Sequence, residues 1–534
     1  MSGEGRIRAV TEWVAAAAGS LAFGASFGWH YGVNNQVVYL LGSLRMVTPG
    51  SFARDWFATQ TTHYHPAYEM LGALLLRLHR DGALIGYGQT LVIACGMLCV
   101  FWLLRLLAGN LGLAAYLLTL AIAFETRTFS VGGSYVFDMI LQPSTLASVG
   151  LLVAVPLFAQ GKWRASSVAL GASGLFHANY LVLSGGAFLV AHGLLGPVAI
   201  RRRLFEQFLM PAIVLLAFAG MIGATAGSPH AKEAQDIYFN VRSPHHFQIA
   251  RFQLDLLAFT AWQGIGFGAI LPMAKNRSSP LARVGALAAG LVIIVWLGLA
   301  LSAAAEIRQA TQLFAWRLAP HVELLLQAAA CAVALRVVAE PGLARRWNAP
   351  SLALLVGGIC LLATHEGLAK HKVLPALVAE LFAIVLAVVL VAAVVGRFAG
   401  PAKRAKAEAG WSRFAPAILA LGGVAIVLQV GRPHLVDVSA HSSMVTGINP
   451  SERELTQWMR ESSPKDALFL TPPGIETLRY HSQRAIVVDW KSNPIVPDEV
   501  LEWHRRLEDV CGRPVRGAGD LGGYDAMDKA RLER

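Results

Sequence analysis

The stretch ALIGYGQTLVIACGMLCVFWLL, Ala83–Leu104, contains no charged residue. A helix of about 20 apolar residues crosses a bilayer core, and in hydrocarbon the backbone groups must bond within their own segment. Residues 284–305 are equally free of charge, and 208–231 and 414–431 are similar. The whole chain has 55% hydrophobic and only 15% charged residues, with a mean hydropathy of +0.51. It is therefore predicted to be an all-α polytopic membrane protein.

The hydrophobic pattern predicts about 13–15 transmembrane or re-entrant helices. The segments expected to cross are 13–30, 67–78, 83–104, 111–125, 133–143, 145–160, 165–177, 180–197, 205–227, 251–272, 284–304, 320–338, 351–366, 373–396 and 414–430. The short segments between 111 and 177 are alternatively re-entrant or broken helices, which are tolerated where protein or a water-filled cavity covers them.

Basic residues cluster in short loops between the apolar runs. They are Arg6, Arg8, Arg77, Arg80, Lys162, Arg164, Arg201, Arg202, Arg203, Lys275, Arg277, Arg283, Arg345, Arg346, Lys403, Arg404, Lys406 and Arg413. A cytoplasmic N-terminus puts all of them on one side, as the positive-inside rule requires, whereas Arg105, Lys370 and Lys372 fall on the other side. This distribution explains the net charge of +12 without nucleic-acid binding. We expect an integral protein of a bacterial inner (plasma) membrane with an extracytoplasmic C-terminal domain.

The composition changes at about Asn449, which predicts a transmembrane helical domain over 1–430 and a soluble α/β domain over 431–534. In the latter, helices are expected at 451–463, capped by Ser451, and at 498–510, with buried strands at 467–470 and 485–490. Helices that alternate with strands imply parallel pairing. The sequence stops within a helix-like stretch, so this small domain is expected to be either truncated or completed by the membrane part.

The polar residues collect on the predicted outer side, beginning with SFARDWFATQTTHYHPAYE at 51–69. Asp55 is the first candidate for chemistry; the alternative is a solvated carboxylate paired with Arg54. His63 and His65 lie nearby and are candidates for substrate binding. Their i, i+2 spacing suits a strand or turn, so the pattern for a divalent metal is weak.

Two more outer loops carry candidate substrate-binding residues. DIYFNVRSPHHFQIARF, 236–252, contains Arg242, His245 and His246, and EIRQATQLFAWRLAP, 306–320, contains Arg308 and Arg317. Arginine matches phosphate in two-point contacts, and histidine serves as proton carrier, ligand or phosphate donor. The alternatives are lipid-headgroup contacts for the arginines and bonds to carbonyl groups for the histidines. We expect the three outer loops to converge on one outward-facing cavity.

Ionisable groups within the apolar runs are costly and usually serve a function. Asp138 and His177 belong to the region of short helices and are expected to face a cavity, where His177 is a further substrate-binding candidate. Glu380 lies mid-run, and pairing with another helix is its alternative role.

The layout resembles the GT-C class of integral-membrane glycosyltransferases. The matching parts are FARDWF with Asp55 in the first outer loop, QPSTLA at 142–147, GLFHANY with His177, and the tail that begins SPKDALFLTPP. The sequence is also similar to uncharacterised bacterial membrane proteins with a PHH outer loop and this tail.

The resemblance implies that a sugar moves from a polyprenyl-phosphate carrier to an acceptor on the extracytoplasmic side. Asp55 would then accept the acceptor's proton, while Arg242, Arg308 and Arg317, with His245 or His246, would stabilise the leaving phosphate. The family often has two acidic residues around an aromatic residue in this loop, whereas RDW has one, so a divalent metal stays an open alternative.

Two other classes of function remain open from the sequence. One is a transporter or lipid flippase without bond chemistry, which would depend on Asp138, Glu380 or His177 more than on Asp55. The other is a non-catalytic membrane assembly protein whose tail binds a partner. Expected partners are membrane lipids and a polyprenyl-phosphate-linked sugar, and not nucleic acid.

Overall fold

The computed structural model describes residues 3–62, 65–126, 130–220, 223, 228–303, 308–369 and 444–527. The expected crossings at 373–396 and 414–430, Glu380 and His63 lie outside these residues.

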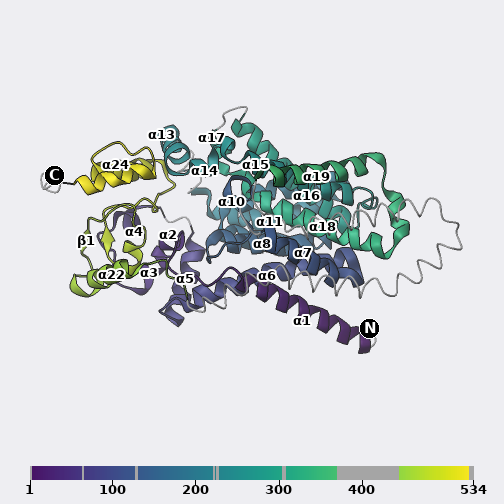
Figure 1. Ribbon diagram of the computed structural model, residues 1–534, viewed down its shortest axis with the longest axis horizontal. Coiled ribbons are helices and arrows are strands. Elements are labelled where there is room, and N and C mark those ends of the chain that lie inside the picture. Colours follow the sequence, from purple (N-terminus) through teal and green to yellow (C-terminus); the bar gives the residue numbers. More distant parts are fainter. Residues whose placement is uncertain are drawn as a thin grey trace.

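Long helices packed side by side form most of the molecule (Figure 1). They are α1 (Gly3–Ala25), α6 (Ala83–Ala108), α7 (Gly112–Thr126), α8 (Pro143–Ala159), α9 (Trp163–Phe176), α10 (Ala178–Leu194), α11 (Ile200–Ala217), α15 (Gln253–Ile270), α16 (Pro280–Ala303), α18 (Ala319–Ala339) and α19 (Ala349–Ala369). In the described residues, Ala83–Phe124, Pro280–Ala303 and Thr311–Ala339 are long and apolar enough to cross a membrane. Shorter apolar helices span Pro143–Ala159, Ala178–Leu194 and Ala349–Leu362. The prediction of a helical membrane protein is confirmed.

Two expected crossings are wrong. The segment 134–142 is irregular and follows the short 3-10 turn η2, Val131–Gly133. Gly132 and Gly133 have φ of +65° and +69°, which only glycine adopts readily, and Pro143 starts a new helix. The other segment forms α5, Pro66–Leu78, whose 13 residues extend only about 20 Å.

Removing these two crossings changes the side on which some basic residues lie. Arg105 Nη1 lies 2.5 Å from Glu12 Oε2 of α1, so Arg105 is at the same end as the N-terminus. The turn before α6 is at the opposite end, where Gly82 abuts the ring of Tyr31. Arg77 and Arg80 therefore lie at the end away from the N-terminus. The expected side was wrong for these two residues and also for Arg105.

The end away from the N-terminus is built from short helices. The first outer loop forms α2 (Gln36–Tyr39), α3 (Leu41–Val47), α4 (Trp56–Gln60) and α5. The second forms α13 (Ala231–Asp236), the π-helical turn η3 (Ile237–Arg242), α14 (Pro244–Phe247) and the 3-10 turn η4 (Ile249–Arg251). The third forms α17 (Arg308–Leu313) and the 3-10 turn η5 (Ala315–Leu318). Leu40, Phe52 and Tyr68 form a separate small core here, which Tyr480 of the tail joins.

The C-terminal segment covers this end (Figure 1). It consists of α22 (Pro450–Ser462), β1 (Leu468–Phe469), α23 (Leu478–Ser482), β2 (Ala485–Ile486), α24 (Pro497–Cys511) and the 3-10 helix η7 (Ala518–Ala526). The strands pair in parallel, with Leu468 opposite Ala485, as the alternation predicted. The cap of α22 is Asn449, whose side chain accepts from the Glu452 amide at 2.8 Å, and not Ser451.

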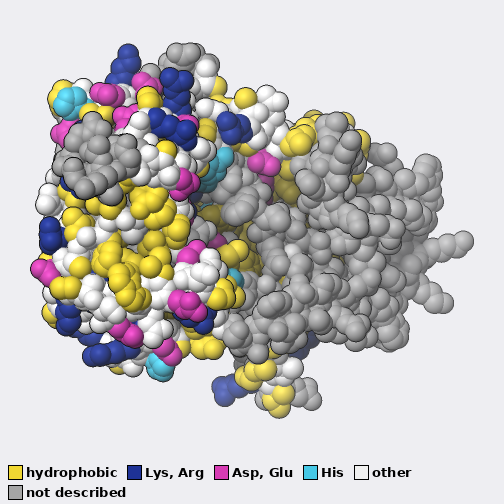
Figure 2. Space-filling view, turned by 60° about the vertical axis from the view of Figure 1, so that its left-hand side comes forward, with side chains coloured by type: hydrophobic (Ala, Val, Ile, Leu, Met, Phe, Trp, Pro, Cys, Tyr) yellow, Lys and Arg dark blue, Asp and Glu magenta, His cyan; other side chains and the backbone are white. Residues whose placement is uncertain are grey.

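The core of the tail lies between α24 and the strands, around Trp503, Leu507 and Val488. Trp56 of the first outer loop and Val241 of the second pack against it, so the tail is joined to both loops. Its outer face carries charged side chains of both signs around an area of hydrophobic ones (Figure 2). The small α/β layer is therefore built onto the loops that carry the predicted site.

Candidate functional site

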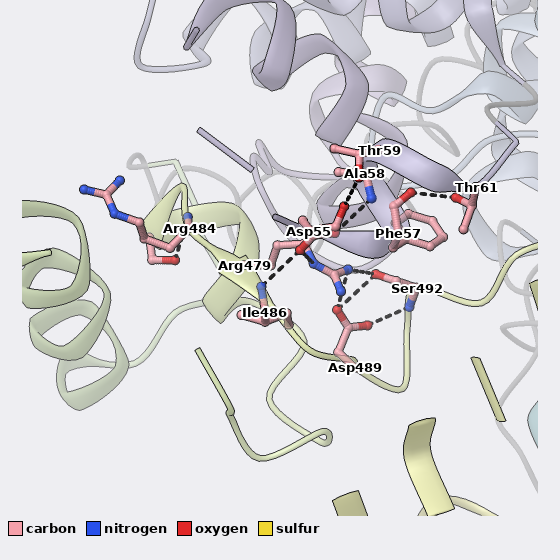
Figure 3. Close-up of polar contacts among 11 residues, drawn as sticks. Asp55, Phe57, Ala58, Thr59, Thr61, Arg479, Arg484, Ile486, Asp489 and Ser492 are labelled. Carbon is pink, nitrogen blue, oxygen red and sulfur yellow. Dashed lines mark hydrogen bonds and ion pairs between the residues drawn. The ribbon is translucent and has the colours of Figure 1, made fainter. Parts of the chain in front are cut away.

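Asp55 lies at the junction between the first outer loop and the tail (Figure 3). It caps α4, and its Oδ1 accepts from the Ala58 amide at 2.9 Å. Its Oδ2 accepts from Arg479 Nε at 2.9 Å and from the Ile486 amide at 3.0 Å. The residue has no exposed surface. Each carboxylate oxygen of Asp55 therefore accepts at least one hydrogen bond from another residue of the protein.

Arg479 continues this network into the tail (Figure 3). Its Nη1 lies 2.7 Å from Asp489 Oδ2 and also donates to Ser492 Oγ. The Ser492 amide donates to Asp489 at 2.6 Å. Arg479 is 2% exposed and Asp489 is 1% exposed, so one guanidinium is buried between two carboxylates. The geometry gives Asp55 a positioning role, and its predicted role as base stays a prediction.

A second polar cluster lies where α9 and α10 meet the outer loops. Arg317, in η5 just before α18, donates from Nη1 to His177 Nε2 at 2.5 Å. The rings of His177 and His65 are 5.0 Å apart, and Tyr39 stands 5.1 Å from His65. His65 Nδ1 donates to the carbonyl of Phe176 at 2.8 Å. Three segments far apart in sequence thus meet around one guanidinium. Three of the predicted substrate-binding residues, His65, His177 and Arg317, form this cluster.

The histidines of this cluster are neutral. Burial lowers the pKa of His65 to about 3, and burial with the nearby Arg317 charge holds the pKa of His177 well below its usual value. No acidic side chain of the described residues lies within 4.0 Å of the Arg317 guanidinium. The Arg317 guanidinium is therefore bonded to a neutral ring, and no carboxylate among the described residues compensates its charge.

Further ionisable groups surround Tyr39. Burial raises the pKa of Tyr39 to about 12, while Arg317, Arg242 and Asp138 all act on it electrostatically. Burial also raises the pKa of Asp138, whose Oδ2 accepts from Gln142 Nε2 at 2.6 Å. The carboxylate of Asp138 is thus held near the cations in a state that takes up a proton more readily than an exposed aspartate.

The tail contributes a cation to the same region. Lys491 donates to Asn34 Oδ1 at 2.8 Å. Burial lowers the pKa of Lys491, the Glu476 carboxylate 4.0 Å away opposes this change, and Arg242 lowers the pKa further. Arg242 donates from Nε to Asn493 Oδ1 at 3.1 Å and stacks 5.3 Å from the Trp490 ring centre. Arg242 and Lys491 therefore place two cations on the tail side, and Lys491 is paired there with Glu476.

The remaining candidates have local contacts. His246 Nδ1 donates to the Gly132 carbonyl at 2.8 Å, and its own carbonyl accepts from Trp316 Nε1 at 2.9 Å. His245 lies 4.0 Å from it, ring centre to ring centre, and is exposed. Arg308 begins α17. Within the described ranges, no three His, Cys, Asp or Glu side chains gather as a metal ion would require.

Sequence reasoning missed Tyr39, Lys491 and Arg479. Tyr39 and Arg479 have no pattern that marks them, because only the packing of the tail on the first outer loop gives them partners. Lys491 did carry a signal. It directly follows the apolar stretch 485–490, and ligands of α/β layers bind at the carboxyl ends of parallel strands.

One family model matches part of the chain, within the tail. A family model described as a domain of unknown function (DUF6798) matches residues 450–510, the segment from α22 to α24. No curated protein matches the chain.

Among solved structures, the fold of the chain is similar to that of two crystal structures of ArnT from Cupriavidus metallidurans. The structure bound to undecaprenyl phosphate covers 93% of this chain and 88% of its own, with 14% identity and a TM-score of 0.45. The apo structure covers 91% and 87%, with 14% identity and a TM-score of 0.42.

Proposed function

We propose that this protein transfers a sugar from a lipid-phosphate carrier to an acceptor at the end of the bundle that the tail covers. The observation that carries the proposal is the Arg317 guanidinium, bonded to neutral His177 and left without a described carboxylate partner. A partly buried cation in this state is best stabilised by an anionic ligand. A phosphate group fits because the guanidinium offers paired donors to it.

The position of the cluster supports a ligand anchored in lipid. Arg317 stands directly before α18, an apolar helix long enough to cross the membrane. Arg242 and Lys491 add two cations from the side of the tail, the second of them paired with Glu476. A phosphate at this boundary would have its prenyl chain in the bilayer and its sugar beneath the tail, where developing charge on the phosphate is stabilised by fixed cations.

The transfer step needs an acceptor for one proton. The bond between the sugar C1 and the carrier phosphate oxygen breaks, and its electron pair leaves on the phosphate. The acceptor hydroxyl oxygen forms the new bond to C1, and its proton passes to a carboxylate. We propose Asp138 for this role because it interacts electrostatically with Tyr39 and Lys491 at the cationic site; Asp55 is the competing candidate.

The anion site is tested by Arg317→Gln. Binding of farnesyl phosphate to the protein in nanodiscs is expected to weaken roughly tenfold or more, the size of one charge-assisted contact. Farnesol, which lacks the phosphate, should bind equally to both forms. The matched control is Arg251→Gln, an exposed arginine at the same end, which should bind farnesyl phosphate normally. Unchanged farnesyl phosphate binding by the Arg317 variant would contradict the proposal.

The same experiment, continued with farnesyl-phosphate-linked sugars, separates a transferase from a flippase. Release of free farnesyl phosphate on addition of acceptor alcohols supports transfer. Binding without release for every sugar tested would favour a transporter that moves the carrier intact.

We further propose that the N-terminus is cytoplasmic and the tail extracytoplasmic, in a bacterial inner membrane. Arg8, Arg105, Arg202 and Arg164 lie at the end with the N-terminus, as the positive-inside rule favours.

This orientation predicts the result of cysteine labelling. The five native cysteines are replaced by serine, and single cysteines are placed at Arg505 or Arg202, whose side chains are 59% and 78% exposed. A membrane-impermeant maleimide should label the Arg505 position in intact spheroplasts and the Arg202 position only after lysis. The reverse pattern would invert the topology.

A further inference from the structure

Three arginines gather at the end of the bundle that holds the N-terminus, opposite the end covered by the tail. Arg203 lies in the first turn of α11, Arg283 in the first turn of α16, and Arg277 in the loop between α15 and α16. Arg203 donates from Nη2 to the carbonyl of Gly196, and a Cβ added at Gly196 would lie 2.9 Å from Arg277 Nη1. Arg203 is also close enough to repel Arg283. These three residues, the arginine triplet, therefore share one part of the surface.

The turn between α8 and α9 holds Arg283 in place. Its Nη1 donates to the carbonyl of Ala159 at 3.0 Å, and its guanidinium carbon lies 5.2 Å from the centre of the Trp163 ring. Gly161 makes room for it, because a Cβ added there would lie 2.8 Å from Nη1. The contacts with Ala159 and Trp163 fix the direction of the guanidinium and leave its Nε and Nη2 groups available to a ligand.

None of the three guanidiniums has a carboxylate within 4.0 Å in the part of the chain that the structure describes. Glu206, on the same helix as Arg203, is paired instead with Arg202 at 2.9 Å and Arg164 at 3.4 Å. Arg203 Nε is buried and has no hydrogen-bond partner among the described residues. A guanidinium that is partly withdrawn from water without a counter-ion is stabilised by an anion. The arginine triplet thus differs from the paired arginines beside it.

An apolar surface continues from the arginine triplet along α11. Its exposed side chains are Phe205, Leu209, Ile213 and Leu216. Their spacing of three or four residues puts them on one face of the helix. Trp163, beside Arg283, belongs to the residue types that prefer the boundary between membrane and water. The triplet therefore lies at the level of lipid head groups, and the exposed face of α11 lies at the level of acyl chains.

We propose that the arginine triplet binds the phosphate of an anionic phospholipid whose acyl chains lie along the exposed face of α11. Arginine offers paired donors to phosphate oxygens, and basic sites between transmembrane helices bind anionic head groups. Arg203 and Arg283 are partly exposed and Arg277 is exposed, so a phosphate reaches all three from the surface. The proposal does not depend on sugar transfer, because the site is at the other end of the bundle.

The experiment is native mass spectrometry of the full-length protein in a non-ionic detergent, with dioleoyl phosphatidylglycerol or dioleoyl phosphatidylcholine added. We expect wild type to bind the anionic lipid more tightly. Arg203→Gln/Arg283→Gln should weaken binding of phosphatidylglycerol at least tenfold, because one arginine beside an anionic head group contributes about fivefold. The matched control, Arg6→Gln/Arg201→Gln, removes two exposed arginines from the same end and should bind this lipid normally. Equal binding of phosphatidylglycerol by wild type and Arg203→Gln/Arg283→Gln would overturn the proposal.

A single variant keeps the test informative if the double variant does not fold. Arg277→Gln changes an exposed side chain, so its thermal unfolding should match wild type, while its binding of phosphatidylglycerol should weaken about fivefold. An unchanged affinity of this variant would also contradict the proposal. Glycerol phosphate, the soluble counterpart of the head group, separates a lipid from a free phosphate ester. It should not displace the lipid at equal concentration, and displacement would overturn the assignment to a phospholipid.

Discussion

Replacing Arg479 with methionine is expected to destabilise the attachment of the tail to the membrane part by about 3–5 kcal/mol, the cost of breaking a buried ion pair. Methionine keeps much of the volume but supplies no charge. The variant leaves Asp55 and Asp489 as two buried carboxylates that have lost their shared cation. The measurement is thermal unfolding in nanodiscs, together with limited proteolysis, which should release a fragment that contains α22–α24.

Two controls separate this network from a general effect of losing an arginine. Arg505→Met removes exposed ion pairs to Glu502 and Asp509 on α24, which contribute about 0–1 kcal/mol. The double variant Asp55→Asn/Arg479→Met has one buried uncompensated charge fewer than Arg479→Met. It should therefore be less destabilised than Arg479→Met alone. If Arg479→Met is as stable and as protease-resistant as wild type, the network does not hold the tail in place.

The fold was predictable where one physical effect dominates. Charge-free runs such as Ala83–Leu104 can only be buried in lipid or protein, so their helices are determined locally. The two strands of the tail were predictable in position and in their parallel pairing, because short apolar runs alternate with amphipathic helices. Their extent was not: each is two residues long, and Leu468 of β1 is exposed, whereas both strands were expected to be buried. The failures came from short segments. At 133–143 the backbone freedom of Gly132 and Gly133 outweighed the apolar composition, and at 67–78 a helix formed that is too short to cross.

The site was predictable only in outline. Two of the three expected outer loops do meet, because His65 of the first and Arg317 of the third both lie against His177. The expected outward-facing cavity stays a prediction. The surroundings of Asp55 were not predictable, because its partners Arg479 and Ile486 come from the tail, more than 400 positions later in the chain. Local sequence suggested Arg54 as its partner. Tertiary packing decides whether a carboxylate is buried and paired or faces a ligand. That packing cannot be read from the residues next to Asp55 in the sequence.

Replacing Asp138 with asparagine is expected to lower sugar transfer by about 10²–10⁴-fold, the usual contribution of a general base. Asparagine keeps the size but accepts no proton, and its single oxygen keeps one of the two bonds that come from Gln142 and the Met139 amide. The measurement is release of carrier phosphate from a polyprenyl-phosphate-linked sugar in nanodiscs. Because burial raises the pKa of Asp138, the active ionised form should be lost at a higher pH than for an exposed aspartate. The wild-type rate should therefore fall as the pH is lowered through this raised pKa, and the residual rate of Asp138→Asn should lack that fall.

Asp55→Asn distinguishes the two carboxylates. Its amide still offers an oxygen to one donor, so at a temperature where the variant is folded we expect weaker attachment of the tail, most of the transfer rate and the wild-type pH dependence. If Asp55 is instead the base, Asp55→Asn loses transfer and the acid fall in rate, while Asp138→Asn keeps both. Thermal unfolding of each variant, measured beside transfer, shows whether a loss of rate comes from chemistry or from a detached tail. Loss of a positioning residue lowers stability and leaves the pH profile of the folded protein unchanged, whereas loss of a base changes the rate and its pH profile.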